Sequence, residues 1–292
     1  MSLAEVVAVG LVGCGVMGRR HAAVVHGDPT ARLACAVDIV DARAEAVAEA
    51  TGASTAWSDD VQLAIIATPT ASHVQLAAPL LARGLWVLVE KPVATDEAEA
   101  GVLDHPRCLV GHCERFNPAV RAGAVHRPTH LQVHREGPWS GRSTDIDVLS
   151  DLMVHDLDLL LGWAGHLECT SARGWRGPSG QLDRAEAELR GQGLVATVVA
   201  DRMGEVRRRT VSGHDAHGSL QLDLARGSAR RDGRVVEVID SDDALSAQWR
   251  SLRARMVVDE PRRHGVEVAV VDEARAALRL ASSIRERIQR CS

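Results

Sequence analysis

Lys91 is the only lysine in this chain of 292 residues, whereas the chain contains 33 arginines. It lies in the sequence Glu90-Lys91-Pro92, directly after the apolar run Leu85–Val89. A desolvated lysine can release its proton near neutral pH, but an arginine stays charged. A single lysine among so many arginines therefore suggests a role in proton transfer. The competing explanation is a codon-biased genome that left one lysine by chance, at a strand end where any cation would serve.

A second group of reactive side chains lies in the segment Ser150–Gly162. Asp151, His155 and Asp158 recur at intervals of four and three residues, which places them on one strip of a helix. Leucine, valine and methionine occupy most other positions, so this helix should be largely buried and its polar strip should face a cavity or a partner. His155 can then act as a general base near neutral pH, with Asp151 holding its tautomer.

Two other interpretations of this strip remain open. The Asp–His pair could seal the helix by a structural hydrogen bond. An aspartate and a histidine four residues apart could also share a metal ion, with His112 and Cys113 recruited as further ligands. Since no further ligand cluster is evident, we expect no metal. Asp156 falls on the apolar side of the helix, and the sequence offers no account of it.

The elements that position Lys91 begin with a glycine-rich turn. The apolar run Val6–Val12 has the length and composition of a parallel strand buried on both faces. Three glycines follow it and open a helix: Gly13 permits the tight turn, Gly15 lets the backbone approach a pyrophosphate, and Gly18 lets the helix pack on the strand. The helix N-terminus would bind the anion. We assign a dinucleotide to the residues Gly13, Gly15, Val16, Met17 and Gly18.

An acidic residue ends the second predicted strand, Leu33–Val37. Asp38 stands 20 residues beyond Gly18, where a carboxylate can accept hydrogen bonds from the adenosine ribose and repel a 2′-phosphate. We therefore expect the cofactor to be NAD, with NADP less favoured.

A third predicted strand, Leu63–Ala67, leads into Thr68-Pro69 and a helix that begins near His73. The stretch that contains Lys91 is the fourth strand. Open α/β sheets bind ligands at the carboxyl ends of their strands, so we expect the threonine turn and Lys91 to lie at that edge. The alternation of strands and helices predicts an α/β Rossmann dinucleotide-binding domain over residues 1–113.

The alternation stops after Pro118. Short runs of alternating polarity, separated by Gly, Pro or Asp-Gly turns, predict an α+β domain over residues 114–292 with a large, mostly antiparallel open sheet. Its predicted strands include residues 129–135, 185–190, 194–200, 206–212, 219–224 and 234–239. Residues 244–258 and 268–289 are predicted helices, and the final one is expected to return to the first domain.

The composition excludes several classes of function. A net charge of −5 gives no general attraction to nucleic acid or to an anionic membrane, and no apolar run is long enough to span one. The six cysteines form no C-x-x-C pair, as is typical of reduced thiols in a cytoplasmic protein. The absence of tyrosine excludes a tyrosine acid. An open sheet needs its outer face covered, so we expect a homodimer or tetramer formed through the second domain.

The motifs together resemble the Gfo/Idh/MocA oxidoreductases. They are Gly13-x-Gly15-x-x-Gly18, Ala67-Thr-Pro69 with His73, Glu90-Lys91-Pro92, and the run Gly111–Pro118 that reads GHCERFNP. The resemblance implies that Lys91 lies beside the nicotinamide and contacts the reacting hydroxyl. It also implies that Glu90, Thr68, Pro69 and His73 line the cofactor site, and that Asp151 and His155 meet the lysine from the other domain.

The resemblance implies reversible oxidation of an alcohol, with hydride passing to the nicotinamide. Lys91 or His155 would take the hydroxyl proton; alternatively Lys91 would stay charged and polarise the oxygen. The sequence cannot separate these roles.

The run around Arg115 and Asn117 resembles the branch of the family that acts on UDP-N-acetylglucosamine at its 3-hydroxyl. The expected substrate is therefore a sugar or nucleotide sugar, held by Arg115 and Asn117 through hydroxyls or phosphate. Alternatively, Arg115 forms an ion pair between the domains. A second possible function is a non-catalytic protein of the same fold that senses a dinucleotide or a sugar, although the retention of Lys91, Asp151 and His155 argues against it.

Overall fold

The computed structural model describes residues 6–141, 146–238, 242–257 and 267–291. The chain divides into two compact units, the first made of residues 1–113 and 245–275 and the second of residues 114–244 and 276–292. The sequence division placed residues 245–275 in the second domain, whereas the structure places them in the first unit. Ile239 and Val258, the last residues of two predicted elements, lie outside the described residues.

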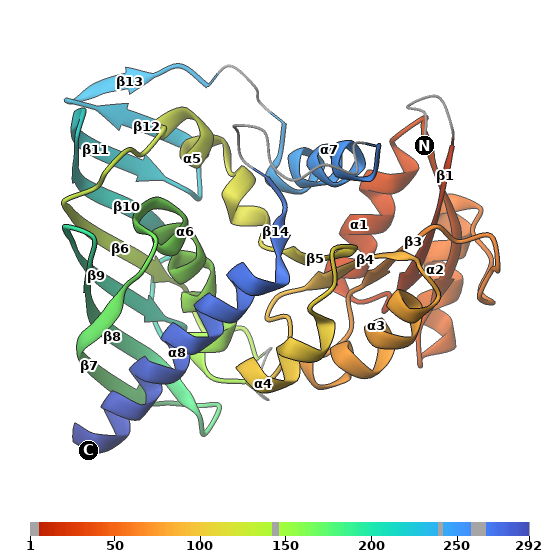
Figure 1. Cartoon of the computed structure of the whole chain (residues 1–292), viewed down its shortest axis with the longest axis horizontal. Coiled ribbons are helices and arrows are strands. Elements are labelled where there is room, and N and C mark those ends of the chain that lie inside the picture. Colours follow the sequence, from red (N-terminus) through yellow and green to blue (C-terminus); the bar gives the residue numbers. More distant parts are fainter. Residues whose placement is uncertain (1–5, 142–145, 239–241, 258–266, 292) are drawn as a thin grey trace. The chain divides into compact units, whose positions relative to one another are not determined.

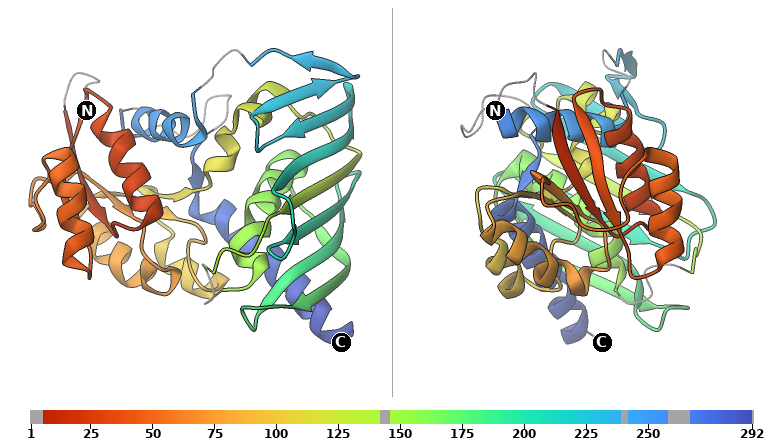
Figure 2. Two further views of the ribbon diagram at one scale, coloured as in Figure 1. Left: turned by 180° about the vertical axis from the view of Figure 1, so that it is seen from behind. Right: turned by 90° about the vertical axis from the view of Figure 1, so that its right-hand side faces the viewer.

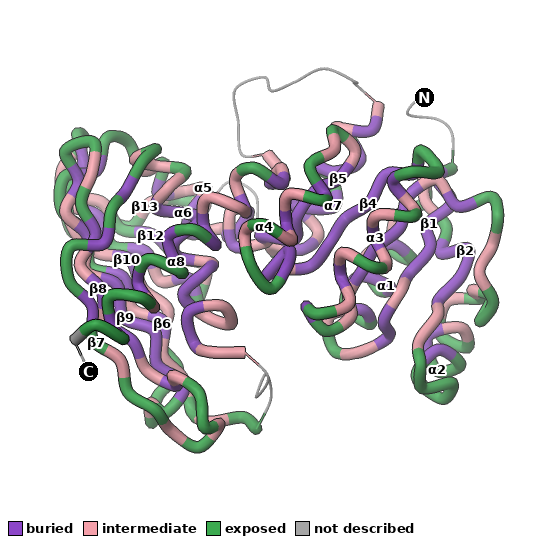
Figure 3. Tube along the Cα trace, turned by 60° about the horizontal axis from the view of Figure 1, so that its bottom comes forward, coloured by how far each residue is buried: buried purple, intermediate pink, exposed green. Residues whose placement is uncertain are grey.

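The first unit contains a six-stranded sheet in the order β14-β5-β4-β3-β1-β2 (Figure 1). Its five parallel strands are β1 (Val7–Val12), β2 (Ala31–Val37), β3 (Leu63–Ile66), β4 (Trp86–Glu90) and β5 (Cys108–Gly111), and the short β14 (Ala269–Val270) pairs antiparallel with β5. Strands β1, β3, β4 and β5 consist mostly of apolar residues and are buried along almost their whole length (Figure 3). This is the pattern of a parallel sheet covered on both faces.

Helices cover both faces of this sheet (Figure 2). One face carries α1 (Val16–His26) and α2 (Asp41–Thr51), and the other carries α3 (His73–Ala82), which follows the short 3₁₀ turn η1 (Thr70–Ser72). The helix α4 (Glu97–Ala100) continues into the 3₁₀ turn η2 (Gly101–Leu103). Helix α2 ends at Gly52, whose left-handed φ of +76° accommodates the C-terminal turn.

Helix α7 (Ala244–Val257) returns to the first unit through polar contacts that local sequence cannot reveal. The indole N–H of Trp249 donates to Asp28 at 2.7 Å, and Arg253 donates to the Thr30 carbonyl at 3.2 Å. Both partners lie between α1 and β2, more than 200 residues earlier in the chain.

The connections of the sheet create a single reversal of direction beside β1. The chain moves from β1 outward to β2, and then crosses to β3 on the other side of β1. Ligands of open α/β sheets bind outside the carboxyl ends of the strands at this reversal. The residues that follow β1 and β3 therefore border the expected ligand site.

The second unit is built on an eight-stranded sheet in the order β13-β12-β11-β10-β6-β9-β8-β7. Its strands are β6 (His130–Glu136), β7 (Glu168–Arg176), β8 (Leu182–Gly191), β9 (Leu194–Asp201), β10 (Arg208–Asp215), β11 (Gly218–Asp223), β12 (Ser228–Arg231) and β13 (Arg234–Val236). Only the β6–β9 pair among these neighbours is parallel. The predicted Rossmann domain and the large, mostly antiparallel open sheet are both confirmed.

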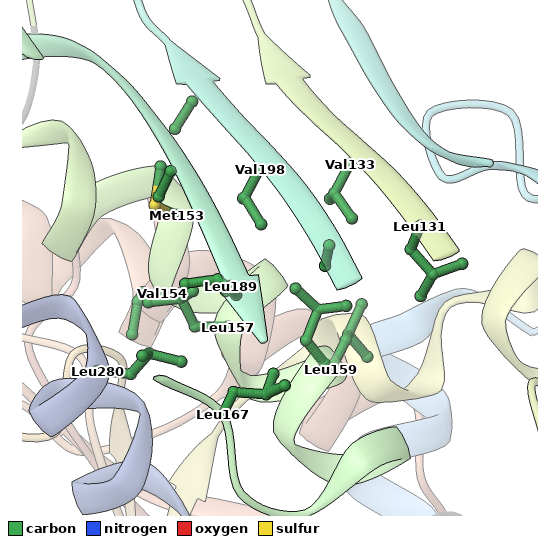
Figure 4. Close-up of a cluster of buried hydrophobic side chains, with 14 of the residues drawn as sticks. Leu131, Val133, Met153, Val154, Leu157, Leu159, Leu167, Leu189, Val198 and Leu280 are labelled. Carbon is green, nitrogen blue, oxygen red and sulfur yellow. The ribbon is translucent and has the colours of Figure 1, made fainter. Parts of the chain in front are cut away.

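Helices pack on one face of this sheet. They are α5 (Pro118–Gly123), which follows the 3₁₀ turn η3 (Cys113–Phe116), a π-helical turn η4 (Leu149–Met153) that runs into α6 (Val154–Ala164), and α8 (Val271–Cys291). Leu157 and Leu159 of α6 pack against Val133 of β6, Leu189 of β8 and Val198 of β9 (Figure 4). This core fixes the segment that carries Asp151 and His155.

The final helix divides between the units. Residues Val271–Arg275 of α8 belong to the first unit, while its buried side chains from Ala277 to Ile288 join the core of the second. The final helix therefore returns to the first domain only through its first turn. None of the helices within the described residues is long and apolar enough to cross a membrane.

Candidate dinucleotide site and proton-transfer residues

The glycine-rich turn occupies the reversal point of the first sheet. Gly13 has φ of +92°, a conformation that favours glycine, and a Cβ there would lie 2.7 Å from the carbonyl group of Ala67. A Cβ on Gly18 would collide with the carbonyl oxygen of Gly13. Close packing between the turn, the loop after β3 and helix α1 therefore requires both glycines.

Gly15 is different, because no described heavy atom lies within 4 Å of where its Cβ would be. It is the N-cap of α1, and its φ of −70° is open to any residue. Helix α1 begins without a side-chain cap and without an acidic residue in its first turn. No side chain of its own first turn competes for the first N–H groups, an arrangement that suits the pyrophosphate of a dinucleotide. The residues present fit the expected cofactor.

Asp38 closes the far side of the turn. Its carboxylate accepts a hydrogen bond from the backbone N–H of Cys14 at 2.7 Å and another from Val40 at 2.9 Å. A carboxylate has about four acceptor positions, so two N–H donors leave capacity for a ribose. Ile39 beside it is fully exposed, which provides an apolar side chain next to the position predicted for adenosine.

His73 joins two loops at the carboxyl edge of the sheet. It is buried, and its ring nitrogens lie 2.9 Å from the Thr68 carbonyl oxygen and 3.0 Å from that of Pro92. Thr68 also accepts a hydrogen bond from the Ser72 hydroxyl at 2.8 Å. The imidazole that the sequence analysis assigned to the cofactor site is thus engaged with backbone, and it holds the threonine turn against the bend that follows Lys91.

Glu90 is buried beside a histidine that the sequence analysis did not identify. Its Oε1 lies 2.7 Å from Nε2 of His21 on helix α1, and its Oε2 accepts the backbone N–H of Lys91 at 3.3 Å. Burial raises the pKa of the Glu90 carboxyl, but His21 and Lys91 together lower it below its usual value. The carboxylate is therefore ionised and fixed, while Lys91 next to it remains partly exposed.

In the second unit, the predicted strip of three polar residues separates into two environments. Asp151 and His155 are half-buried, whereas Asp158 is buried and pairs with Arg115 through two hydrogen bonds of 2.7 and 2.5 Å. The interval of three residues from His155 to Asp158 leaves them about 60° apart around an α-helix. Only Asp151 and His155 remain as accessible candidates.

Asp151 is held by an arginine that lies 51 residues further along the chain. Nη1 of the buried Arg202 approaches Asp151 at 3.4 Å, and its Nε donates to Asp183 at 2.6 Å. Its Nη2 donates to the carbonyl of Ile146, just before the helix begins. Arg202 thus fixes both the start of this helix and one of its candidate catalytic carboxylates.

A second arginine, Arg285 of α8, secures the same segment. It donates to Asp147 at 2.7 Å and to the Ser150 hydroxyl at 3.1 Å. Burial raises the pKa of the Asp147 carboxyl, but Arg285 and Ser150 lower it by more, so the pKa lies below its usual value. Long-range charge pairs therefore set the position of the π-helical turn on which Asp151 lies.

The structure explains Asp156, for which the sequence offered no account. Asp156 is buried and accepts two hydrogen bonds of 2.8 Å from the buried Arg135 of β6, which also donates to Glu114 at 2.9 Å. Burial raises the pKa of the Glu114 carboxyl, but Arg135 lowers it more. This network anchors the helix that carries His155 to the centre of the sheet.

Asn117 also belongs to this structural network. Its side-chain amide donates to Glu114 at 3.0 Å and to the Leu224 carbonyl at 2.9 Å, and its oxygen caps α5 by accepting the Ala119 N–H. Arg115 and Asn117 thus have polar groups engaged within the second unit, and their assignment to the substrate stays a prediction. Arg115 forms its ion pair with Asp158 inside this unit.

Within the described ranges, no group of three or more His, Cys, Asp or Glu side chains has the geometry to hold a metal ion.

Comparisons with known proteins identify the family to which the chain is similar. Residues 7–105 match the GFO_IDH_MocA model, described as an oxidoreductase family with an NAD-binding Rossmann fold. The UDP-N-acetylglucosamine 3-dehydrogenase of Acidithiobacillus ferrooxidans is 31% identical over 282 residues, which cover 82% of this chain and 88% of that protein. An inositol 2-dehydrogenase of Rubrobacter xylanophilus is 30% identical over 251 residues, covering 77% and 71%.

The fold agrees as well. The solved structure of the Acidithiobacillus ferrooxidans enzyme matches with a TM-score of 0.86 at 27% identity and covers 98% of each chain. The sheet and its glycine turn therefore define an NAD(P)-binding oxidoreductase of the Rossmann class. The chain belongs to the Gfo/Idh/MocA family, and the resemblance noted in its motifs is confirmed.

Proposed function

We propose that this protein is an NAD-dependent dehydrogenase that oxidises a secondary hydroxyl of a nucleotide sugar, with the 3-hydroxyl of UDP-N-acetylglucosamine as the best candidate. The observation that carries the proposal is the meeting of three loops at one sheet edge: the glycine turn, the Thr68 turn and the bend at Lys91. This arrangement supports a reacting group placed beside a dinucleotide.

Asp38 supports NAD as the cofactor. Its carboxylate is fixed by two backbone N–H groups at the end of β2, so it cannot easily move away from an incoming ribose. A fixed negative charge accepts hydrogen bonds from ribose hydroxyls and repels a 2′-phosphate. Arg43, whose guanidinium lies 3.9 Å from Asp38, is half exposed and offsets this charge only in part.

Bound NAD would supply the hydride acceptor for the reaction. In the proposed mechanism the hydroxyl proton goes to one acceptor. Either His155 accepts it, with Asp151 orienting the imidazole and stabilising the imidazolium while Lys91 donates a hydrogen bond from its ammonium to the substrate oxygen, or Lys91 accepts it directly. Arg202 keeps Asp151 in place. Assigning Lys91 and His155 to one hydroxyl is part of the proposal.

The substrate class is supported by the relatives, because the UDP-N-acetylglucosamine 3-dehydrogenase aligns with most of this chain. Inositol dehydrogenases align over a smaller share. UDP-N-acetylglucosamine and inositol both present a ring with secondary hydroxyls, but only the former carries a nucleotide.

The test is reduction of NAD or NADP, monitored by nicotinamide absorbance, with UDP-N-acetylglucosamine, UDP-glucose, N-acetylglucosamine and myo-inositol as substrates. We expect turnover with UDP-N-acetylglucosamine and NAD. Turnover only with myo-inositol would refute the substrate assignment. Saturable dinucleotide binding without turnover of any sugar would favour a sensor.

Preference for NAD is tested with the Asp38→Ser variant, which should lose NAD affinity and gain relative affinity for NADP. An unchanged ratio of the two affinities would refute the role of Asp38.

A further inference from the structure

The side chains of His21 and Glu90 form a buried polar pair whose partners are 69 residues apart in the sequence. His21 is 3% exposed and Glu90 is 6% exposed. Burying a carboxylate destabilises the fold unless a partner compensates it, and an apolar pair of similar volume is often as stable or more stable. The stability of the fold therefore does not by itself explain a buried His21–Glu90 pair. The segments that the pair connects suggest another role.

The neighbouring strand makes room for this carboxylate. Glu90 is paired in register with Gly111 of β5, and a Cβ on Gly111 would lie 2.9 Å from Oε1 of Glu90. Strand β5 therefore has a glycine, without a side chain, at the position next to the Glu90 carboxylate. This is an independent indication that the position of the carboxylate is specified.

The pair links the two parts of the proposed cofactor site. His21 lies on α1, which has Gly15 as its N-cap and Gly18 in its first turn, and Glu90 accepts the backbone N–H of Lys91. A displacement of α1 against the sheet must move His21, and through Glu90 it must act on the backbone of Lys91. The other side of the bend is tethered independently, because Pro92 contacts His73.

We propose that His21 and Glu90 are positioning residues that couple occupation of the glycine turn by the pyrophosphate to the orientation of Lys91. The inference rests on the proposed dinucleotide site, but it does not depend on the substrate. Lys91 then reaches its working orientation when the cofactor is bound, and the single lysine of the chain is controlled from the helix that holds the phosphates.

The single lysine makes the coupling directly observable. Protein grown with [¹⁵N]lysine gives one backbone amide signal, that of Lys91, whose N–H donates to Glu90. The probe is ADP-ribose, which has the pyrophosphate and adenosine but lacks the nicotinamide that would lie beside Lys91. Its binding is followed separately by calorimetry.

We expect saturating ADP-ribose to move the Lys91 signal in the wild type. The displacement should be lost in His21→Leu, although ADP-ribose still binds, and should be restored in His21→Gln, because the glutamine amide can donate to Glu90 in place of Nε2. The matched control is His26→Leu, an exposed histidine on the same helix, which should respond as the wild type does.

If His21→Leu fails to fold, the double variant His21→Leu/Glu90→Leu replaces both partners and should also lose the displacement. An unmoved signal in the wild type, or an equal displacement in the leucine variants, overturns the coupling. If ADP-ribose, NAD and NADP all fail to bind, the dinucleotide site and the coupling are refuted together. Binding with a displaced signal but without sugar turnover refutes only the proposed reaction.

Discussion

Lys91 and His155 are assigned different tasks, and single substitutions can separate them. The side chain of Lys91 extends from a bend whose backbone is tied to Glu90 on one side, while the carbonyl of Pro92 is tied to His73 on the other. A cation of different shape at this position keeps the charge but changes the distance and the proton chemistry. His155 lies on a helix that is otherwise fixed by apolar packing and by Asp156.

Lys91→Arg should retain NAD binding and lose turnover by about 100-fold or more, the range for loss of a proton-transfer group. Arginine preserves the positive charge beside Glu90 but does not exchange a proton near neutral pH. Calorimetric NAD affinity and kcat are the two measurements. Near-normal kcat in this variant would show that Lys91 only supplies charge.

His155→Ala should reduce kcat by about 100-fold or more and flatten the acidic limb of the pH–rate profile. The limb arises because a protonated imidazole cannot accept the hydroxyl proton, so the wild-type rate falls as pH falls. His134→Ala, on strand β6, is the control and should leave the profile unchanged. An acidic limb that persists in His155→Ala would assign it to another group.

At the scale of elements, each unit positions its candidate residues by a different means. The glycine turn is set by local packing between successive elements, as Gly13 against Ala67 illustrates. The segment that carries Asp151 is set by charges from distant elements: Arg202 follows β9, and Arg285 lies on α8. Local packing at the glycine turn can be deduced from a sequence motif, whereas the distant charge pairs that hold Asp151 are known only from the fold.

Substitution by alanine should have different effects at Gly15 and at Gly18. Gly15→Ala should leave thermal stability unchanged, because its Cβ would meet only open space, but should weaken NAD binding by about tenfold or more, since the methyl group occupies the space proposed for pyrophosphate. Gly18→Ala should lower Tm, because its Cβ collides with Gly13. Equal NAD affinity in Gly15→Ala and the wild type would contradict the proposed cofactor position.

The β10–β11 hairpin should contribute a pH-dependent part of the stability of the second unit. Burial raises the pKa of Asp215, but Arg231 and the backbone amides of His126 and His217 lower it to about 2. A carboxyl with a lowered pKa stabilises the fold above its unfolded value near 4, and this contribution disappears as pH falls to about 2. Its magnitude at pH 5 is about 2 kcal/mol.

Chemical denaturation of the wild type and Asp215→Asn between pH 5 and pH 2 measures this contribution. The difference in free energy of unfolding between the wild type and Asp215→Asn should shrink as pH falls through that interval. The difference between the wild type and Arg231→Met should shrink in the same way. A difference that does not change with pH would mean that Asp215 acts only as a turn residue.

At the scale of the whole molecule, the sequence predicted the order and type of the layers well. The α/β domain, the large, mostly antiparallel sheet and the membership in an oxidoreductase family are confirmed. These features follow from local patterns: buried apolar strands, alternating strands, and glycines spaced for a turn. The helix from 244 to 257 was assigned to the wrong unit, because its attachment depends on Trp249 meeting Asp28.

Site residues that act through distant partners could not be predicted. The sequence around His21 predicts only that it lies on a helix, and its contact with Glu90 is known only from the fold. Arg202 was one of 33 arginines, without a local signal that it would hold Asp151. The sequence around Asn117 gave no sign of its capping role, since an amide suited to a sugar hydroxyl is equally suited to capping a helix.

The central claim is that hydride leaves a defined carbon of a nucleotide sugar for NAD. The most direct measurement uses UDP-N-acetylglucosamine deuterated at carbon 3 of the sugar, with mass spectrometry of the reduced cofactor and of the sugar product. We expect one deuterium in the reduced nicotinamide and a 3-keto sugar, with neither formed by Lys91→Arg. Reduced cofactor without deuterium, or no reduction although NAD binds, would contradict it.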